Sequence, residues 1–214
     1  MSSVVVIDYG MGNLHSIAKA LQHASANVHV QIESDPAVIM RADRVVFPGV
    51  GAIRDCMNAL QRSGLDEVIR QVVTDKPVLG ICLGMQALLT DSEENEHCGC
   101  LNIIPGHVVR FPKAIRNGRN EILKVPHMGW NEVQQRSAHP LWQNIAPHSR
   151  FYFVHSYYVQ PDETGVVAAT ATYPDSFCCA IEQENIFAVQ FHPEKSQRPG
   201  LTLLHNFLHW DGSS

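Results

Sequence analysis

The stretch with the clearest chemical potential is VLGICLGMQ, residues 78–86. Gly80, Cys82 and Gly84 form the pattern GxCxG, which is typical of a sharp strand–turn–helix connection that presents a nucleophile. Because glycine has no side chain, the backbone can bend tightly on both sides of the cysteine and place its thiol at the start of a helix. Unpaired N–H groups and partial positive charge at that position favour a thiolate over a thiol. The alternative is a buried cysteine in a glycine-rich core turn.

A cysteine nucleophile needs a base, and the base needs an orienting group. The segment VQFHPEKS, residues 189–196, supplies both. Pro193 disfavours helical backbone at His192 and holds that residue extended. Since residues two apart in an extended chain project to the same side, the carboxylate of Glu194 can approach the imidazole of His192, fix its tautomer and stabilise the imidazolium. The alternative is a surface histidine beside a surface glutamate.

Two further features would complete such a site. The glycine-rich turn FPGVG, residues 47–51, follows an apolar strand, and the amides of Val50 and Gly51 are the expected donors to an oxyanion. The alternative is an ordinary tight strand–helix turn. Gln86 lies four residues beyond Cys82 and therefore on the same face of the following helix. Its amide can recognise another amide, or simply cap a polar surface.

Two other patterns are similar to binding motifs but lack a required part. Residues 10–15 read GxGxxH, which lacks the third glycine of the dinucleotide fingerprint, and the preceding strand ends in Asp8 at the turn itself. His97, Cys98 and Cys100 lie together like metal ligands, but no second pair stands at the spacing of a structural zinc site. We therefore expect neither a nucleotide cofactor nor a metal, and we interpret the three residues as part of a solvent-exposed loop.

The composition is that of one globular domain. The chain has 214 residues, of which 45% are hydrophobic and 17% are charged, enough for a sizeable core. Its formal net charge is −5, and its 16 Lys and Arg residues form no basic stripe in the sequence. A nucleic-acid-binding module would normally carry such a stripe. We therefore expect small molecules or proteins as partners.

The sequence predicts a cytosolic protein. No apolar run approaches the roughly 18 residues that a membrane helix needs. The first ten residues, MSSVVVIDYG, have no basic region and reach Asp8 too early for a signal peptide. The six cysteines stand at irregular spacing, which does not indicate a disulfide framework and suits a reducing compartment.

Fully apolar strands alternate with helical patterns in the first half of the chain. Strands are expected at 4–8, 28–32, 44–49 and 78–82, and helices from Leu14, after Pro36, at 52–62 and at 65–74. This alternation predicts a doubly wound α/β arrangement with a parallel sheet covered on both faces. In such sheets the site lies at the carboxyl ends of the strands. Cys82 and the turns at 9–13 and 48–51 all fall at that edge.

The pattern changes after residue 90. The acidic segment 91–100 is expected to be a surface loop. Strands are then expected at 107–111, 151–159, 166–173, 177–183 and 186–191, followed by a helix near 200–210. Glu184 and Asn185 can form the turn of a hairpin, and Cys178 and Cys179 should face opposite sides of a strand. The fold class predicted is therefore α/β, with a mostly parallel sheet and antiparallel strands in the C-terminal half.

Six segments in order give the chain a resemblance to one family over nearly its whole length: IDYGMGNLHSI, FPGVGA, GICLGMQ, KVPHMGWN, FYFVHSYY and QFHPEKS. GICLGMQ and FHPE are shared in similar form by many class I, triad-type glutamine amidotransferases. DYGMGNLHS, PHMGWN and FVHSYY point more narrowly to the glutaminase subunits of imidazole glycerol phosphate synthases. By this resemblance the chain is identified as a member of that family, which implies the class I glutamine amidotransferase fold.

The resemblance implies hydrolysis of L-glutamine to glutamate and ammonia by a Cys–His–Glu triad without a cofactor. Cys82 would attack the side-chain amide, and His192, oriented by Glu194, would carry the proton to the leaving ammonia. Water would then release glutamate from a glutamyl thioester. Val50 and Gly51 would supply the oxyanion donors. The residues expected to hold glutamine are Gly49, Gln86, His155, Ser156 and Tyr157.

The family also implies a partner. In the family, ammonia passes through a tunnel to a (β/α)8-barrel cyclase subunit, which makes imidazole glycerol phosphate and aminoimidazole carboxamide ribotide in histidine biosynthesis. A heterodimer is therefore expected. The residues that match family positions at or near the interface are Asn13, Ser16, Trp130 and Lys195. An aromatic anchor such as Trp130 suits an interface, and the alternative for it is a core tryptophan.

Other functions fit parts of this pattern. Related subunits serve other amidation pathways, and a stand-alone cysteine hydrolase acting on γ-glutamyl substrates would use the same turn. A non-enzymatic protein could use Cys82 as a redox sensor, but a sensor needs neither His192 nor Glu194. Residues 112–124 match no family position one by one, and we assign no site there.

Overall fold

The structure, a computed structural model, describes residues 2–112, 115–116, 118 and 120–213. Its strands are β1 (Ser2–Ile7), β2 (Val28–Glu33), β3 (Arg44–Gly49), β4 (Val78–Cys82), β5 (Asp91–Ser92), β6 (Cys98–Gly99), β7 (Gly106–Arg110), β8 (His127–Glu132), β9 (Gln134–Gln135), β10 (Arg150–His155), β11 (Tyr157–Pro161), β12 (Val167–Thr172), β13 (Ser176–Gln183) and β14 (Ile186–Val189). Its helices are α1 (Leu14–Ala24), α2 (Pro36–Arg41), α3 (Ile53–Ser63), α4 (Leu65–Val72), α5 (Leu83–Ala87) and α6 (Gln197–His209), with short 3-10 helices η1 (Pro140–Trp142), η2 (Thr164–Val166) and η3 (Pro193–Lys195). Of the helices in these residues, none combines the length and apolar character needed to cross a membrane.

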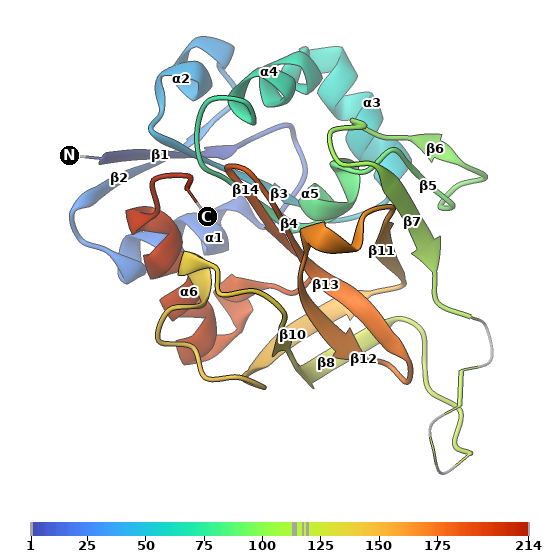
Figure 1. Cartoon of the computed structure of the whole chain (residues 1–214). Helices are drawn as coiled ribbons and strands as arrows, with labels where there is room; N and C mark the ends of the chain where they lie inside the picture. Colours follow the sequence, from blue (N-terminus) through green and yellow to red (C-terminus); the bar gives the residue numbers. More distant parts are fainter. Residues whose placement is uncertain (1, 113–114, 117, 119, 214) are drawn as a thin grey trace.

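In the described part of the chain, twelve strands form one mixed sheet. Ten of them follow the order β2-β1-β3-β4-β14-β13-β11-β7-β5-β6, β12 pairs with β13, and β9 pairs with β12 (Figure 1). The neighbours from β2 to β14 run parallel. Strand β13 runs antiparallel to β14, β12 and β11. Strands β8 and β10 form a separate antiparallel ribbon. The predicted fold class is therefore confirmed.

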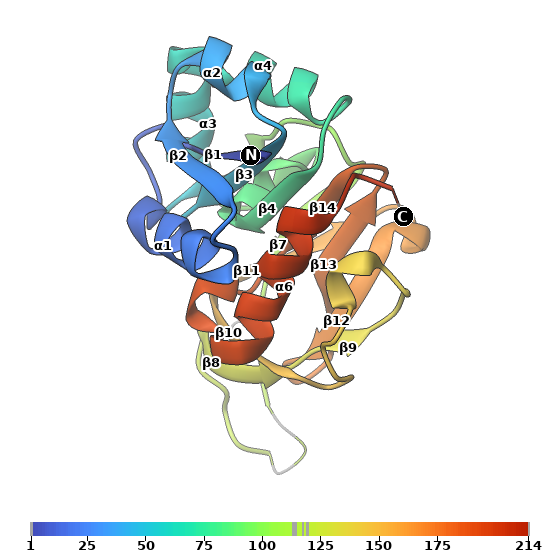
Figure 2. The same ribbon diagram turned by 90° about the vertical axis from the view of Figure 1, so that its left-hand side faces the viewer.

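Helices cover both faces of the parallel part of the sheet. Helices α1 and α6 lie side by side on one face together with the β8–β10 ribbon, and α2, α3, α4 and α5 lie on the other (Figures 1 and 2). Within β1, Val4 and Val6 enter the first core while Val5 and Ile7 enter the second. A strand buried on both faces needs a continuous apolar run, which is why VVVI and VLGIC carry no charged residue.

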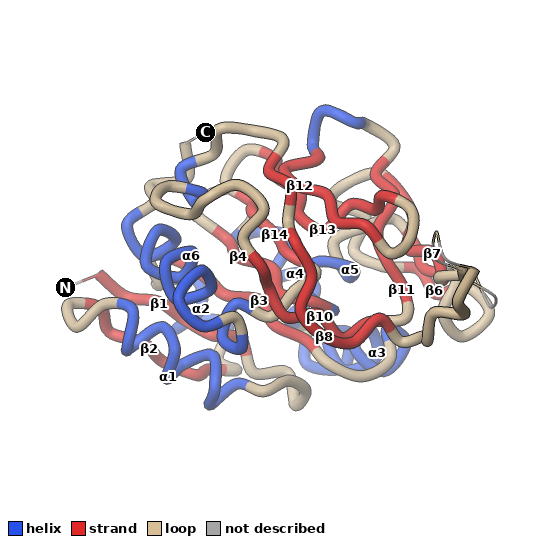
Figure 3. The backbone as a smooth tube through the Cα atoms, turned by 90° about the horizontal axis from the view of Figure 1, so that it is seen from below, coloured by secondary structure: helices blue, strands red, loops and turns tan. Residues whose placement is uncertain are grey.

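The prediction of one strand over 151–159 is wrong. Strand β10 ends at His155, β11 begins at Tyr157, and Ser156 forms the bend between them. Strand β10 pairs with β8, whereas β11 pairs with β7 and β13, so the chain leaves the ribbon for the main sheet here (Figure 3). Nδ1 of His155 lies 2.8 Å from the carbonyl oxygen of Tyr157. This local bond across the bend competes with a continuous strand ladder.

The acidic segment 91–100 is more ordered than a surface loop. It contains β5, which pairs parallel with β7, and β6, which pairs antiparallel with β5. The N–H of Cys100 also donates to the carbonyl oxygen of Thr90 at 2.9 Å. The segment therefore extends the edge of the main sheet, and this backbone pairing fixes the direction in which its acidic side chains point.

Two local predictions in the C-terminal half are confirmed. Residues 184–185 form the turn of the β13–β14 hairpin, in which Glu184 has a φ of 51°. Cys178 and Cys179 pack into different cores on opposite faces of β13. The second outcome follows from the alternation of side chains along a strand.

Candidate active site

Cys82 stands at the end of β4 and directly before α5, in a backbone conformation that is unusual for a residue with a side chain. Its φ of 55° and ψ of −108° are of the strained kind that clusters at functional turns. A Cβ at Gly84 would lie 1.9 Å from the carbonyl oxygen of Phe47, and one at Gly80 would lie 2.8 Å from the Cβ of Ala188. Both flanks of the cysteine therefore require glycine, because β3 and β14 pack directly against the turn.

His192 and Glu194 follow the end of β14, at the same edge of the sheet as Cys82. Nδ1 of His192 lies 2.9 Å from Oε1 of Glu194, and the two side chains are 4% and 1% exposed. The predicted contact is present, although Glu194 lies in the 3-10 helix η3 and not in extended chain. Burial lowers the pKa of His192, but Cys82 and Glu194 outweigh burial and raise that pKa to about 10.

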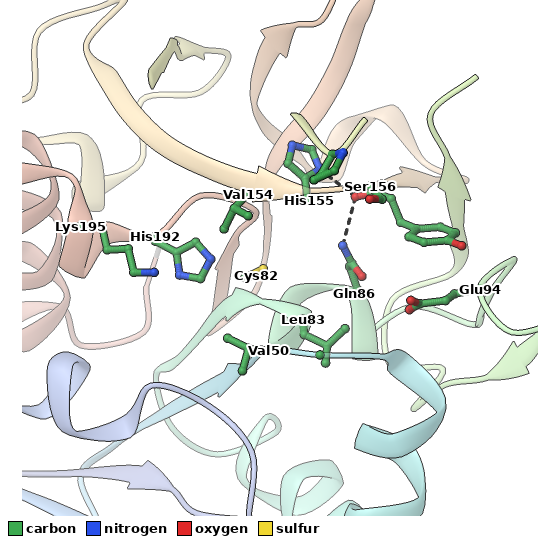
Figure 4. A pocket seen from close by; sticks show the side chains of 13 residues that line it. Val50, Cys82, Leu83, Gln86, Glu94, Val154, His155, Ser156, His192 and Lys195 are labelled. Atoms are coloured by element: carbon green, nitrogen blue, oxygen red, sulfur yellow. Dashed lines mark hydrogen bonds between the residues drawn. The ribbon is translucent and has the colours of Figure 1, made fainter. Parts of the chain in front are cut away.

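The second ring nitrogen of His192, Nε2, is not used in the contact with Glu194. Within the described residues, Nε2 of His192 is buried and has no partner at hydrogen-bond distance. Figure 4 shows the imidazole beside Cys82 at one end of a cavity. Cys82 is close enough to raise the pKa of the ring, and Nε2 is available to give or take a proton at this end of the cavity.

Sequence reasoning missed Gln190, which touches the cysteine. This residue follows β14 and is fully buried, with 0% of its surface exposed. Its Nε2 donates to Sγ of Cys82 at 3.6 Å, and its Oε1 accepts from Nε2 of Gln86 at 2.9 Å. Because buried amides need partners at both ends, Gln190 fixes the position of Cys82 relative to Gln86. The available signal was one polar residue inside the apolar run IFAVQF.

The cavity in front of Cys82 has a volume of about 330 Å³. This volume is at the lower end of the roughly 300–1,000 Å³ typical of small-molecule sites. Figure 4 shows Cys82 and His192 at one end, Gln86 in the middle and Glu94 at the other end. The predicted residues that line it are Val50, Gly51, Cys82, Gln86, His155, Ser156, Tyr157, His192 and Lys195.

Gln86 lies one helical turn beyond Cys82, as predicted, and is 4% exposed. Its Nε2 donates to Oε1 of Gln190 and, at 3.1 Å, to the carbonyl oxygen of Tyr157. Both hydrogens of the amide are therefore used. Its Oε1 is left as the group that can face a ligand, and an acceptor there suits an N–H donor of a bound molecule.

Both ring nitrogens of His155 have hydrogen-bond partners within the protein. Nδ1 lies 2.8 Å from the carbonyl oxygen of Tyr157, and Nε2 lies 2.9 Å from Nδ1 of His127. Burial lowers the pKa of His155 to about 3, so the ring is neutral at pH 7. The side chain of His155 therefore has no free nitrogen for glutamine. The predicted contact with glutamine would come from the backbone of His155 and from Ser156 and Tyr157, which also line the cavity.

Val50 and Gly51 form the side of the cavity that follows β3. Val50 is 40% exposed, and Gly51 has a φ of 97°, in the region that favours glycine. Gly49 lies behind them, where a Cβ would meet the hydroxyl of Tyr9 at 2.5 Å and the Cβ of Leu83 at 2.8 Å. The oxyanion role of Val50 and Gly51 and the binding role of Gly49 remain predictions.

Glu94 is a second residue of the cavity that sequence reasoning missed. The segment that contains β5 and β6 brings it to the end of the cavity opposite His192 (Figure 4). Its Oε2 accepts from the N–H of Ile53 at 2.9 Å, which holds the carboxylate at the start of α3. In the acidic run DSEENE, nothing local distinguishes the one carboxylate that points inward.

The side chains predicted to meet a partner are all exposed: Asn13, Ser16, Trp130 and Lys195. Trp130 is 38% exposed, so it is not a core tryptophan. Nζ of Lys195 lies 5.9 Å from the centre of the Tyr152 ring. Lys195 therefore lies between the cavity and the outer face of the β8–β10 ribbon. Contact of these residues with a partner remains a prediction.

Comparison with known proteins agrees with the fold and with the sequence motifs. A sequence model of the family "Glutamine amidotransferase class-I" matches residues 5–210. The imidazole glycerol phosphate synthase subunit HisH of Methylococcus capsulatus is 59% identical over 212 residues, covering 99% of this chain and 98% of that protein. The subunit of the same name from Nitrosococcus oceani is 58% identical over 214 residues, covering 100% of both chains.

Solved structures of low sequence identity share the fold. The structure of PurLQS from Thermotoga maritima has a TM-score of 0.72 at 14% identity, covering 97% of this chain and 98% of that one. A glutamine amidotransferase crystal structure has a TM-score of 0.68 at 16% identity, covering 92% and 94%. The chain belongs to the class-I glutamine amidotransferase family and, within it, to the HisH subunits of imidazole glycerol phosphate synthase.

Proposed function

We propose that this protein is the glutaminase subunit of an imidazole glycerol phosphate synthase and hydrolyses L-glutamine to glutamate and ammonia for histidine biosynthesis. One observation carries the proposal. At the end of a cavity of small-molecule size, a cysteine on a strained turn lies beside a buried histidine whose other nitrogen is held by a buried glutamate. The similarity to HisH subunits over the full chain supports the substrate and the pathway.

The triad arrangement supports nucleophilic catalysis through a thioester. The thiol proton of Cys82 passes to Nε2 of His192, and the resulting thiolate sulfur attacks the carbonyl carbon of the side-chain amide, which forms the C–S bond and an oxyanion. His192 donates a proton from Nε2 to the amide nitrogen, the C–N bond breaks, and ammonia leaves. Water then attacks the thioester while His192 takes its proton, and the C–S bond breaks to release glutamate. Glu194 holds the imidazole in the required tautomer throughout.

The groups at the two ends of the cavity support one orientation of glutamine. The amide end lies at Cys82, where the amides of Val50 and Gly51 would stabilise the oxyanion. The carboxylate of Glu94 lies at the far end and would accept hydrogen bonds from the α-ammonium group. Between these ends, Oε1 of Gln86 is a fixed acceptor. Glutamate would differ from glutamine at the Cys82 end alone.

The names of the relatives describe subunits, which supports a second subunit for this chain. We propose that this partner is a (β/α)8-barrel cyclase and that ammonia passes to it without release to water. Its contact surface would include Asn13, Ser16, Trp130 and Lys195, all of them exposed. The six free cysteines fit a protein that acts in the cytosol.

The test is glutamate release by the full chain, alone and with the barrel subunit and its nucleotide ligand. Cys82→Ala should lower kcat by about a thousandfold or more, because the nucleophile is lost, while partner binding stays unchanged. Cys178→Ala is the matched control, since Cys178 is also a buried cysteine, at 9% exposure against 8% for Cys82. This control should retain activity.

Two results would contradict the proposal. Turnover retained by Cys82→Ala would exclude the cysteine mechanism. Full turnover of glutamine by the isolated chain, with no gain from the barrel subunit, would instead support a stand-alone hydrolase and exclude the synthase assignment.

A further inference from the structure

A chain of hydrogen bonds runs from β8 to the cysteine through residues that the triad mechanism does not use. It begins at Asn131 and passes through His127 and His155 to the carbonyl oxygen of Tyr157. That oxygen also accepts from Gln86, which bonds Gln190 and thereby Cys82. The two histidines are 4% and 6% exposed, so their contacts are shielded from solvent.

The orientation of the Asn131 side-chain amide determines which ring nitrogen of His127 carries the hydrogen. Oδ1 of Asn131 accepts from the N–H of Glu132 at 2.8 Å, and its Nδ2 donates to the carbonyl oxygen of Thr172 at 2.9 Å. The amide cannot be reversed without losing both bonds. The same Nδ2 lies 3.3 Å from Nε2 of His127. This ring nitrogen must therefore be the acceptor, and the hydrogen of a neutral His127 lies on Nδ1.

The other end of the pair leads to the same arrangement. Nδ1 of His155 faces the carbonyl oxygen of Tyr157 at 2.8 Å and must carry a hydrogen, because a carbonyl only accepts. Its Nε2 faces Nδ1 of His127 at 2.9 Å, and only one hydrogen fits between them. That hydrogen belongs to His127. The hydrogen bonds of Asn131 and those of Tyr157 thus lead to the same assignment. Both rings are neutral, and each carries its hydrogen on Nδ1.

We propose that His127 and His155 are positioning residues that, as two neutral rings with hydrogen on Nδ1, hold the Tyr157 carbonyl and through it the Gln86 amide in the orientation that binds glutamine. The inference rests on the proposed glutaminase function and deepens it. With the Tyr157 oxygen fixed, Nε2 of Gln86 is directed to Tyr157 and Gln190, and Oε1 of Gln86 faces the cavity. Without it, the Gln86 amide can rotate.

The surroundings of the pair allow the hydrogen bonds to be removed without removing the ring. His127 stacks on Tyr173 at 4.1 Å and on Phe153 at 5.0 Å between ring centroids. A phenyl ring at position 127 keeps this packing and loses both nitrogens. An asparagine at position 127 instead places an amide donor near the former Nδ1. His127→Phe and His127→Asn therefore separate the loss of the hydrogen bond from the loss of the ring.

The direct test is the tautomer of each ring in the full chain at pH 7. Labelling with ¹⁵N-histidine and long-range ¹⁵N–¹H correlation spectra distinguish hydrogen on Nδ1 from hydrogen on Nε2, and His127→Phe assigns the signals. Both His127 and His155 should be neutral with hydrogen on Nδ1. A ring found with hydrogen on Nε2, or as an imidazolium, would overturn the proposal.

The kinetic test separates positioning from a structural role. With the barrel subunit present, His127→Phe should raise KM for glutamine about tenfold, as expected for one lost buried hydrogen bond, and leave kcat within about threefold. His127→Asn should restore KM to within about threefold of the native value.

The matched control is His139→Phe. Like His127, His139 is 4% exposed, and burial lowers the pKa of both histidines to about 4. The ring of His139 packs on Phe187 and Trp210 in the core, and its Nδ1 accepts from the N–H of Leu141 at 3.1 Å. None of these contacts leads to the cavity. His139→Phe should therefore cost stability as His127→Phe does, with KM for glutamine unchanged.

An unchanged KM in His127→Phe, or an equal rise in His139→Phe, would overturn the inference. If the native protein with its partner releases no glutamate from glutamine, the proposed function fails instead. The tautomer measurement separates these outcomes, because it does not depend on activity.

Discussion

The two sides of the cavity are held in place by different forces. On the side of Cys82, β3 and β14 pack so closely against β4 and the turn after it that Gly80 and Gly84 have no room for a Cβ. On the opposite side, at the bend between β10 and β11, buried hydrogen bonds join His127, His155 and the carbonyl oxygen of Tyr157. The backbone turn that carries Cys82 is placed by steric exclusion, and the bend that carries Tyr157 is placed by polar contacts.

Each side of the cavity should therefore resist a different perturbation. Steric exclusion does not depend on pH, but it tolerates no added atom. A polar network tolerates changes of shape, but it depends on the protonation of its members. Substitutions of glycine should therefore act mainly on the Cys82 side, and acid should act mainly on the side of His127 and His155.

The largest effect is expected from Gly84→Ala. The new Cβ would lie 1.9 Å from the carbonyl oxygen of Phe47, a backbone atom of β3 that cannot rotate away. We expect a loss of about 4 kcal/mol or more in the free energy of unfolding, together with loss of glutaminase activity. Urea unfolding of the purified variant measures the first effect, and glutamate release measures the second.

Gly165→Ala is the control for this prediction. A Cβ at Gly165 would meet no atom within 4 Å, and its φ is not in the left-handed region. The free energy of unfolding should change by no more than about 0.5 kcal/mol. If Gly84→Ala were as stable as Gly165→Ala, steric exclusion would not be what places Cys82.

The next effect is loss of stability in acid. Burial lowers the pKa of His127 to about 4 and that of His155 to about 3, whereas both titrate near 6.5 in the unfolded chain. As the pH falls below 6.5, the unfolded state takes up protons that the folded state excludes, so stability decreases. Between pH 7 and pH 5 each of these histidines should cost at most about 2 kcal/mol of stability.

On the Cys82 side of the cavity, the stability contributed by His192 should depend on pH in the opposite direction. The pKa of His192 is raised to about 10, so its contribution is complete below pH 6.5 and is lost as the pH rises towards 10. The titratable groups next to the acid-sensitive pair are Tyr173, which stacks on His127, and His192 itself. Urea unfolding at pH 7 and pH 5 measures the acid effect. If the free energy of unfolding of His127→Phe depended on pH as that of the native chain does, this prediction would be wrong.

The parts of the site that the sequence predicts are those fixed by short spacings. Gly80, Cys82 and Gly84 report a local steric need, and His192 and Glu194 are close enough in sequence for their contact to be inferred. The parallel strands follow from apolar runs buried on both faces, and the ends of these runs locate the edge at which the site lies.

The rest depends on contacts between segments that are distant in sequence. The strand expected over 151–159 breaks at Ser156 because its two halves find different partner strands. Glu94 enters the cavity because β5 pairs with β7. Gln190 acquires its place only when β14 lies beside β4. No local pattern encodes these pairings, so propensity and periodicity could not reveal them.

The smallest effect on the isolated chain is expected from Trp130→Ala, on the outer face of the β8–β10 ribbon. Trp130 and Met128 are 38% and 62% exposed on this face. Trp130 meets Tyr152 edge to face, with ring centroids 6.1 Å apart. Loss of this one contact should change the free energy of unfolding by no more than about 1 kcal/mol.

The same change should weaken binding of the barrel subunit by about 2 kcal/mol, or roughly thirtyfold, because a buried aromatic anchor would be lost from the interface. Titration calorimetry of the two subunits measures this. Arg41→Ala, an exposed position at the end of α2 on the other side of the sheet, should leave the affinity unchanged. If both variants bind as tightly as the native chain, the outer face of the ribbon is not the docking surface. His127 and His155, on the inner face, would then affect glutamine binding alone.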